Sequence, residues 1–231
     1  MREDKRSDGG MSAAELALAL AYIPVHLFAL PYLIALPYRA GRLDATGANL
    51  VCYAAGAVYM LLALHGCFKR GFYSLCDYGP RALLDILKGY GFMLLGGIAV
   101  SLALALAGRA DNPNNAAVFS MAGEDPGRTA AIAVFLAPLV EEPMFRGGVF
   151  CLLRRRSRAA AYAVSTLLFA LYHVWGYVGG DAANLLYLLQ YLPAGLALAR
   201  CREKTDSIWT PIFLHMLSNG VSMLALSAMR G

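Results

Sequence analysis

The stretch TAAIAVFLAPLVEEPMFRGGVFCLL, residues 129–153, has the length of a membrane-spanning helix but carries three charged residues near its centre. A group that is ionised at membrane depth costs at least about 2.5 kcal/mol on insertion scales, so these three are candidates for function. Because Glu142 and Arg146 lie four residues apart with the acid first, we expect an ion pair between them. Glu141 points about 100° away and lacks that partner. Pro143 cannot donate a backbone hydrogen bond, which predicts a bend beside the carboxylates.

The composition of the whole chain also indicates a membrane protein. Of its 231 residues, 59% are apolar and 15% are charged, whereas soluble domains average about 45–50% and about 25%. These values exclude an ordinary soluble enzyme and a disordered chain. A span needs about 20 apolar residues, and about seven candidate spans are predicted, near residues 11–37, 47–68, 82–108, 129–153, 159–178, 182–200 and 207–229.

The predicted fold is therefore all-α, a polytopic transmembrane helical bundle that forms a single integral membrane domain, 1–231. Residues 1–128 hold three N-terminal spans, and residues 129–231 hold a core of four helices. Three prolines predict a bent first span: Pro24, Pro31 and Pro37. Four glycines of the third span indicate close helix packing: Gly89, Gly91, Gly96 and Gly97.

Charges between the spans predict the orientation. Alternate connections carry thirteen Lys and Arg on the side of the N-terminus and five on the opposite side, which favours a multi-pass protein with a cytoplasmic N-terminus and an external C-terminus. The connection 109–128, rich in Asn, Asp, Gly and Pro, is predicted to be an external loop with two turns. The net charge of +5 is thus a topology signal that also suits anionic lipid, and nucleic acid is not an expected partner. The five cysteines are scattered without a C-x-x-C pair, so no chemistry is assigned to them.

Two further spans present polar residues at helical spacing. Phe169 lies one turn before His173, and His215 lies one turn before Asn219. An unpaired Glu with two His and an Asn is a set that can activate water and stabilise an oxyanion. The other two histidines, His26 and His65, lack acidic neighbours at helical spacing and are interpreted as packing or interfacial residues.

The residues alone leave several alternatives open. The polar set could be structural, joining helices within the bundle. One carboxylate and two imidazoles, Glu141, His173 and His215, also suit zinc or iron, as in a metal-dependent membrane protease or a metal transporter. A catalytically idle immunity or scaffold protein that binds a peptide partner is a third alternative, and an ion-coupled transporter is a fourth.

The three motifs together, Glu141-Glu142-x-x-x-Arg146, Phe169-x-x-x-His173 and His215-x-x-x-Asn219, resemble those of the CAAX protease and bacteriocin-processing enzyme family (CPBP, or Abi family). The resemblance covers residues 129–229. Each motif alone is weak, but their order within predicted spans is specific. Residues 1–128 carry no motif of this family.

The resemblance implies an intramembrane glutamic endopeptidase that needs no metal or other cofactor. It implies that Glu141 and His173 activate water, that His215 and Asn219 form the oxyanion hole, and that Glu142, Arg146 and Phe169 support the site or position the substrate. Members similar to this chain include eukaryotic enzymes that cut C-terminal tripeptides from prenylated CAAX proteins and bacterial ones linked to peptide processing or bacteriocin self-immunity. The expected partners are a membrane-associated peptide or protein and the lipid bilayer. The compact length favours a prokaryotic cell membrane.

Overall fold

A computed structural model of the chain describes residues 10–229, and every regular element in this part is helical. The predicted all-α class is confirmed. In chain order the elements are α1 (Ala13–Pro24), η1 (Val25–Ala29), α2 (Leu30–Arg39), α3 (Ala45–Ala63), α4 (His65–Tyr78), α5 (Arg81–Leu106), α6 (Pro113–Glu124), α7 (Pro126–Ala130), η2 (Ala131–Leu136), α8 (Ala137–Glu142), η3 (Pro143–Val149), α9 (Phe150–Arg154), α10 (Arg158–Val178), η4 (Ala182–Tyr187), α11 (Leu188–Thr205) and α12 (Trp209–Ala228).

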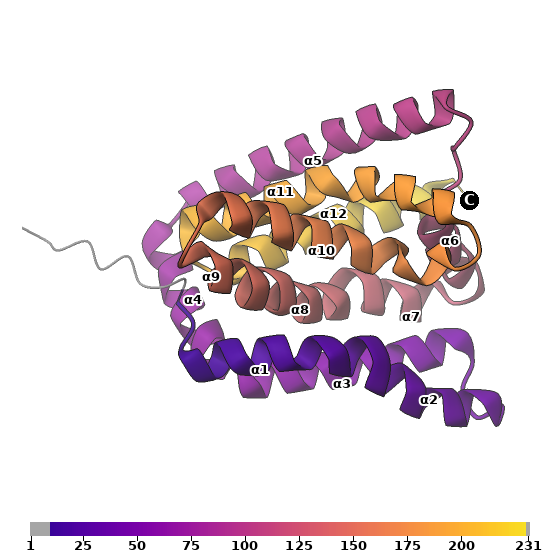
Figure 1. Cartoon of the computed structure of the whole chain (residues 1–231), viewed down its shortest axis with the longest axis horizontal. Coiled ribbons are helices and arrows are strands. Elements are labelled where there is room, and N and C mark those ends of the chain that lie inside the picture. The colour runs from indigo at the N-terminus through magenta and orange to yellow at the C-terminus, as the bar shows by residue number, and fades with distance from the viewer. Residues whose placement is uncertain (1–9, 230–231) are drawn as a thin grey trace, which may run out of the picture.

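Six helical segments in the described part are long and apolar enough to cross a membrane, so the chain is a multi-pass membrane protein. The sequence predicts about seven spans, and the predicted span at 129–153 is the one that is not among these six. It runs through the bundle as α7, η2, α8, η3 and α9 (Figure 1), and the turns η2 and η3 are π-helical. Pro138 and Pro143 each remove a backbone donor, which favours a series of short helices. The three charged residues Glu141, Glu142 and Arg146 distinguish this segment from the six apolar spans.

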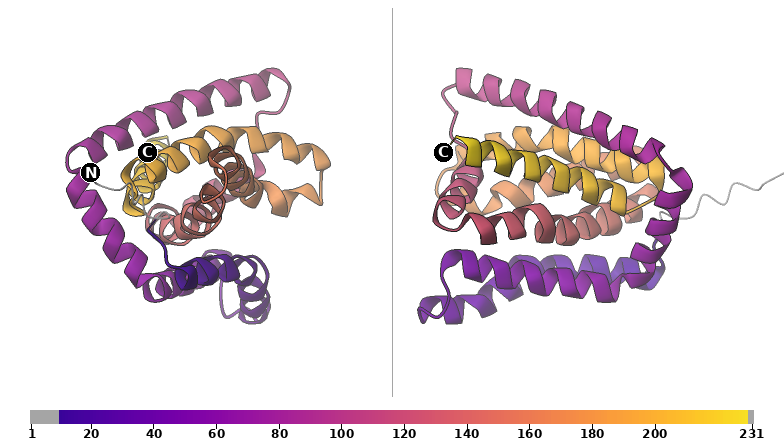
Figure 2. Two further views of the ribbon diagram at one scale, coloured as in Figure 1. Left: turned by 60° about the vertical axis from the view of Figure 1, so that its left-hand side comes forward. Right: turned by 180° about the vertical axis from the view of Figure 1, so that it is seen from behind.

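The C-terminal segments form the centre of the bundle, and the N-terminal segments flank them on two sides (Figures 1 and 2). On one side α1 packs against η3, and α3 packs against α8. On the other side α5 packs against α11 and α12. Helix α4 connects the two flanks at one end of the bundle.

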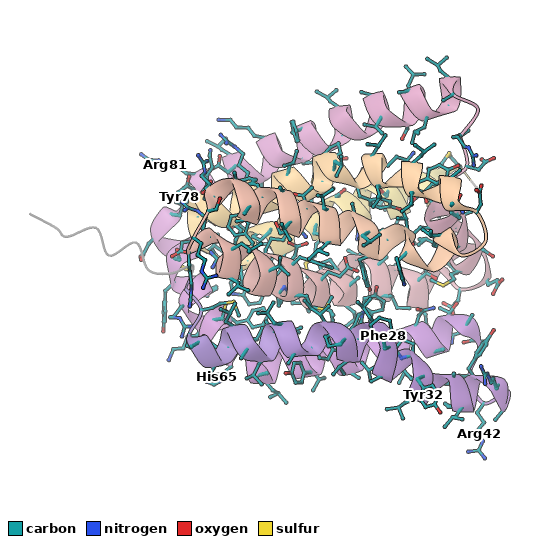
Figure 3. The ribbon with its side chains drawn as sticks, viewed as in Figure 1. Phe28, Tyr32, Arg42, His65, Tyr78 and Arg81 are labelled. Carbon is teal, nitrogen blue, oxygen red and sulfur yellow. The ribbon has the colours of Figure 1, made fainter. Side chains whose placement is uncertain are left out.

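The first apolar segment bends, as its prolines predict. Helix α1 ends at Pro24, the π-helical turn η1 follows, and α2 leaves the line of α1 (Figure 1). Phe28 and Tyr32 point outward from this segment (Figure 3), with 63% and 74% of their surfaces exposed. A large exposed apolar surface of this kind suits contact with lipid.

The prediction of a loop at 109–128 is wrong, because this connection contains helix α6 and the start of α7. The side chain of Asn112 accepts hydrogen bonds from the backbone N–H groups of Asn114 and Asn115, and Pro113 occupies the first turn. Both are features of a helix N-terminus. Asp125 caps α7 in the same way, accepting from the N–H of Arg128.

Two of the four glycines in α5 lie at close helix contacts. A Cβ on Gly89 would lie 2.7 Å from a methyl carbon of Leu214, and one on Gly96 would lie 2.7 Å from Cβ of Pro193. The packing interpretation is therefore confirmed for these two. It is wrong for Gly91 and Gly97, where an added Cβ would meet no described atom within 4 Å.

Candidate active site

The four residues predicted to be catalytic all line one cavity of about 720 Å³. Glu141 comes from α8, His173 from α10, and His215 and Asn219 from α12. Helices α3 and α6 supply further walls, so the cavity lies between the central segments and the N-terminal flank. The structure thus brings together residues that are up to 78 positions apart in the sequence.

The carboxylate of Glu141 has two different surroundings. Its Oε1 atom accepts a hydrogen bond from the hydroxyl of Tyr53 at 3.2 Å. Its Oε2 atom lies 3.8 Å from Nε2 of His173 and 4.0 Å from Nε2 of His215. These two separations are too long for direct hydrogen bonds but suit a water molecule that bridges the three groups. Glu141 itself is buried.

The second nitrogen of each imidazole determines which tautomer the ring adopts. His173 Nδ1 lies 2.8 Å from the carbonyl oxygen of Phe169, and His215 Nδ1 lies 2.8 Å from Oε1 of Glu142. A carbonyl and an ionised carboxylate only accept hydrogen bonds, so Nδ1 carries the proton in both rings. In their neutral forms both rings therefore direct the lone pair of Nε2 toward Glu141.

Glu142 and Arg146 form the predicted ion pair, with Nη1 of Arg146 donating to Oε1 of Glu142 at 3.2 Å. Both side chains are fully buried. Nη2 of Arg146 also donates to the carbonyl of Gly195, and its guanidinium lies 4.2 Å from the ring centre of Phe169. The pair positions both histidines. Glu142 accepts a hydrogen bond from His215, and Arg146 packs on the ring of Phe169, whose carbonyl accepts a hydrogen bond from His173.

Asn219 lines the cavity with its amide held in a fixed orientation. Its Nδ2 donates to the carbonyl oxygen of Ala133 in η2 at 2.8 Å. An amide nitrogen carries two hydrogens. One hydrogen therefore orients the group, and the second is available to a ligand in the cavity.

A series of hydrogen bonds that the sequence did not predict reaches Glu141 from the N-terminal flank. The hydroxyls of Tyr53 and Tyr172 lie 2.7 Å apart, and Tyr172 lies 3.0 Å from Nε2 of His26. His26 is buried, which agrees with its interpretation as a packing residue, and it also lines the cavity, with the hydroxyl of Tyr22 3.4 Å from its Nδ1. Tyr22 and His26 lie four residues apart in an apolar segment, and this helical spacing could have predicted the hydrogen bond between these two residues. His65 is exposed, which agrees with its interpretation as an interfacial residue.

Among residues 10–229, no group of three or more His, Cys, Asp or Glu side chains is placed to hold a metal ion.

Comparisons with known proteins agree with the motifs. Residues 126–221 match the family of type II CAAX prenyl endopeptidases described as Rce1-like. The chain is also 29% identical over 89 residues to the Bacillus subtilis protein named "Putative membrane peptidase YdiL", a match that covers 38% of this chain and 33% of that relative. No solved structure shows significant similarity to the chain. The matched region contains every candidate catalytic residue, and in this region the chain is similar to the Rce1-like type II CAAX prenyl endopeptidases.

Proposed function

We propose that this protein is a glutamate-dependent intramembrane endopeptidase that hydrolyses a peptide bond without a metal ion. The observation that carries the proposal is the position of Oε2 of Glu141, 3.8 and 4.0 Å from the Nε2 atoms of His173 and His215. One water held there would face a carboxylate able to accept its proton. The similarity of residues 126–221 to a family of endopeptidases, and of part of the chain to a relative named as a membrane peptidase, supports the same reaction.

In this mechanism Glu141 acts as the general base. It accepts a proton from water while the water oxygen attacks the carbonyl carbon of the peptide, and the C=O bond becomes a C–O⁻ group. The protonated Glu141 then gives that proton to the leaving nitrogen as the C–N bond breaks. His173 orients the water by accepting its second hydrogen.

Asn219 and His215 stabilise the oxyanion in this proposal. The second N–H of Asn219 is free of the Ala133 contact and can donate to the negative oxygen. His215 donates from Nε2 only when both ring nitrogens are protonated, a form in which Glu142 still accepts from Nδ1. Glu142, Arg146 and Phe169 are positioning residues.

The substrate is a membrane-associated protein or peptide in this proposal, either of the CAAX type or one that takes part in peptide processing or self-immunity. The chain matches only about a third of the length of its curated relative. The activity and substrates of the whole protein are therefore part of the proposal.

The test compares wild type, Glu141→Gln and Glu124→Gln in detergent, each incubated with peptides from a bacterial membrane proteome. Glu124 is an exposed glutamate at the end of α6, so its variant controls for the loss of one carboxylate. Mass spectrometry reads the new termini. We expect the same cleavage sites in wild type and Glu124→Gln and none in Glu141→Gln. Equal cleavage by all three would contradict the proposal, and no cleavage by any would favour a binding or immunity protein.

A further inference from the structure

The basic residues of the described chain gather at one end of the bundle. Ten lie in or beside the connections at this end: Lys69, Arg70, Arg81, Arg154, Arg155, Arg156, Arg158, Arg200, Arg202 and Lys204. Four lie at the opposite end: Arg39, Arg42, Arg109 and Arg128. Figure 3 shows Arg81 and Arg42 at these opposite ends. The topology prediction also counted Arg2, Lys5, Arg6 and Arg230, which lie outside the described residues.

The cavity lies in the half of the bundle near the end with few basic residues. Its lining residues in α3 run from Asn49 to Tyr53, in the first turns after the connection that holds Arg42. Its lining residues in α10 run from Tyr172 to Tyr177, in the last turns of that helix. Helix α6, which follows the connection at this same end, supplies a further wall.

The outer part of the cavity is neutral and polar with one aromatic residue. Asn49 and Asn115 are exposed there, together with Ser222 of α12 and Phe119 of α6. Amide and hydroxyl groups can both donate to and accept from a peptide backbone. The floor holds Glu141 and the two histidines, so a chain that enters between α3 and α6 reaches the proposed base.

Lys and Arg accumulate in cytoplasmic connections, and the cavity opens at the other end. We infer that the substrate is a polypeptide whose scissile segment lies on the non-cytoplasmic side of the membrane, either exported or anchored in the bilayer. This inference rests on the proposed peptidase function. A soluble cytoplasmic protein would meet the basic end of the bundle, which is the end away from the cavity.

Cysteine labelling tests the side of entry directly. Cys76 is an exposed natural cysteine in α4, at the basic end. Asn115→Cys, made with Cys52→Ala and Cys76→Ser, places a thiol at the outer part of the cavity. The backbone N–H of Asn115 donates to the side chain of Asn112, and this contact does not depend on the side chain at position 115. Ser222→Cys in the same background is a second reporter if the first protein does not fold.

A membrane-impermeant maleimide is added to spheroplasts and to inside-out vesicles. The fraction of each variant that is labelled is divided by the fraction that is labelled after solubilisation in detergent. We expect Asn115→Cys to label at least about ten times more in spheroplasts than in inside-out vesicles, and Cys76, in Cys52→Ala, to show the reverse. Labelling of Asn115→Cys from the cytoplasmic side, or equally from both sides, would overturn the inference. The labelling does not depend on catalysis. If the cleavage experiment showed no cleavage that depends on Glu141, the proposed function would be contradicted. The labelling result would still decide from which side of the membrane the cavity is reached.

Discussion

Tyr53 links the N-terminal flank to the proposed general base. Its hydroxyl donates to Oε1 of Glu141, which leaves Oε2 facing the two imidazoles. A hydrogen bond to a charged group contributes about 1.5–3 kcal/mol. We therefore predict that Tyr53→Phe lowers kcat for peptide hydrolysis about 10- to 100-fold and leaves KM nearly unchanged, because the ring stays and only the orientation of the base is lost. Steady-state kinetics on one cleaved peptide measure both constants.

Tyr59→Phe is the matched control for Tyr53→Phe. The Tyr59 hydroxyl donates to the carbonyl of Leu18 rather than to Glu141. We expect this variant to keep the wild-type kcat. If Tyr53→Phe behaved like Tyr59→Phe, or raised KM alone, the positioning role of Tyr53 would be wrong.

The buried pair of Glu142 and Arg146 gives a second prediction for single residues. Arg146→Met leaves a buried carboxylate without its cation, and breaking such a pair costs about 3–5 kcal/mol. We expect this loss in the free energy of unfolding, measured by denaturant titration in detergent. The double variant Glu142→Leu/Arg146→Met should recover much of it, because an apolar pair removes the uncompensated charge. Unchanged stability in Arg146→Met would show that the pair is not essential to the fold.

The motif residues could be predicted from sequence, but their hydrogen-bond partners could not. Glu141, His173, His215 and Asn219 stand out because polar groups are rare in apolar segments. Tyr53 does not stand out, since the chain has 13 tyrosines. Its contact with Glu141 joins residues 88 positions apart. The periodicity of residues within one helix does not predict which residues of two different helices come into contact.

Among the elements, α6 shows why the sequence predicts a loop where the structure has a helix. Asn, Asp, Pro and Gly are typical of turns, but Asn and Asp also cap helices. Asn112 and Asp125 act as caps here. The apolar stretch between them, from Ala116 to Ala122, was too short to be recognised beside spans of about 20 residues.

The segment 126–154 could be placed in the bundle from its composition, but its π-helical turns could not. Pro143 predicts a break beside the carboxylates, and η3 begins at Pro143. The turn η2 ends at Leu136, two residues before Pro138, and the carbonyl of Ala133 within it accepts a hydrogen bond from Asn219. Which carbonyl becomes available depends on packing between helices, so the sequence of one helix does not predict it.

The contact between α5 and α11 gives a prediction at the scale of elements. In Gly96→Ala the new Cβ would meet Pro193 at 2.7 Å, a rigid ring that cannot move aside easily. We expect a lower thermal unfolding temperature in detergent, because overpacking costs about 1–3 kcal/mol.

Gly97→Ala is the control on the same helix, since no described atom lies within 4 Å of its added Cβ. Alanine is favoured over glycine in helices by about 1 kcal/mol, so this variant should unfold at the same or a higher temperature. If both variants behaved alike, α5 would not pack against α11 as described.

For the whole molecule, Arg128 ties the N-terminal flank to the core at the end where the cavity opens. It contacts Asp44, the cap of α3, at 2.7 Å and Asp125, the cap of α7, at 2.5 Å. Hydrogen bonds from Arg128 lower the pKa of Asp44, and the backbone N–H and guanidinium of Arg128 lower the pKa of Asp125. Both groups lie outside the spans.

These lowered pKa values predict a loss of stability in acid. A carboxylate whose pKa is lower in the folded state stabilises that state above its unfolded pKa of about 3.9, and the stabilisation is lost as pH falls through the folded pKa. We expect Arg128→Gln to reduce the fall in unfolding temperature between pH 6 and pH 3, and the effect is small because these groups are exposed. Arg42→Gln, at the same end, should retain the wild-type pH dependence. A steeper acid dependence in Arg128→Gln would contradict this account.

The three sequence motifs lie in the C-terminal half of the chain and therefore identify only part of the cavity that holds the candidate active site. The walls of the cavity come from α3 and α6 as well as from α8, α10 and α12. The bundle of apolar helices was predictable from composition. The arrangement of the flanks on opposite sides of the core was not, because apolar helices in a bilayer carry little information about which neighbour they contact.

In the proposed mechanism, Glu141 activates water for peptide hydrolysis without a metal ion. The most direct measurement follows cleavage of one Glu141-dependent peptide in H₂¹⁸O, with wild type and Glu141→Gln both dialysed against a chelator. We expect an unchanged wild-type rate after chelation, one ¹⁸O atom in the new carboxyl terminus, and no cleavage by Glu141→Gln. Loss of the wild-type activity on chelation and its return with added metal, or cleavage at the same bond by Glu141→Gln, would contradict it.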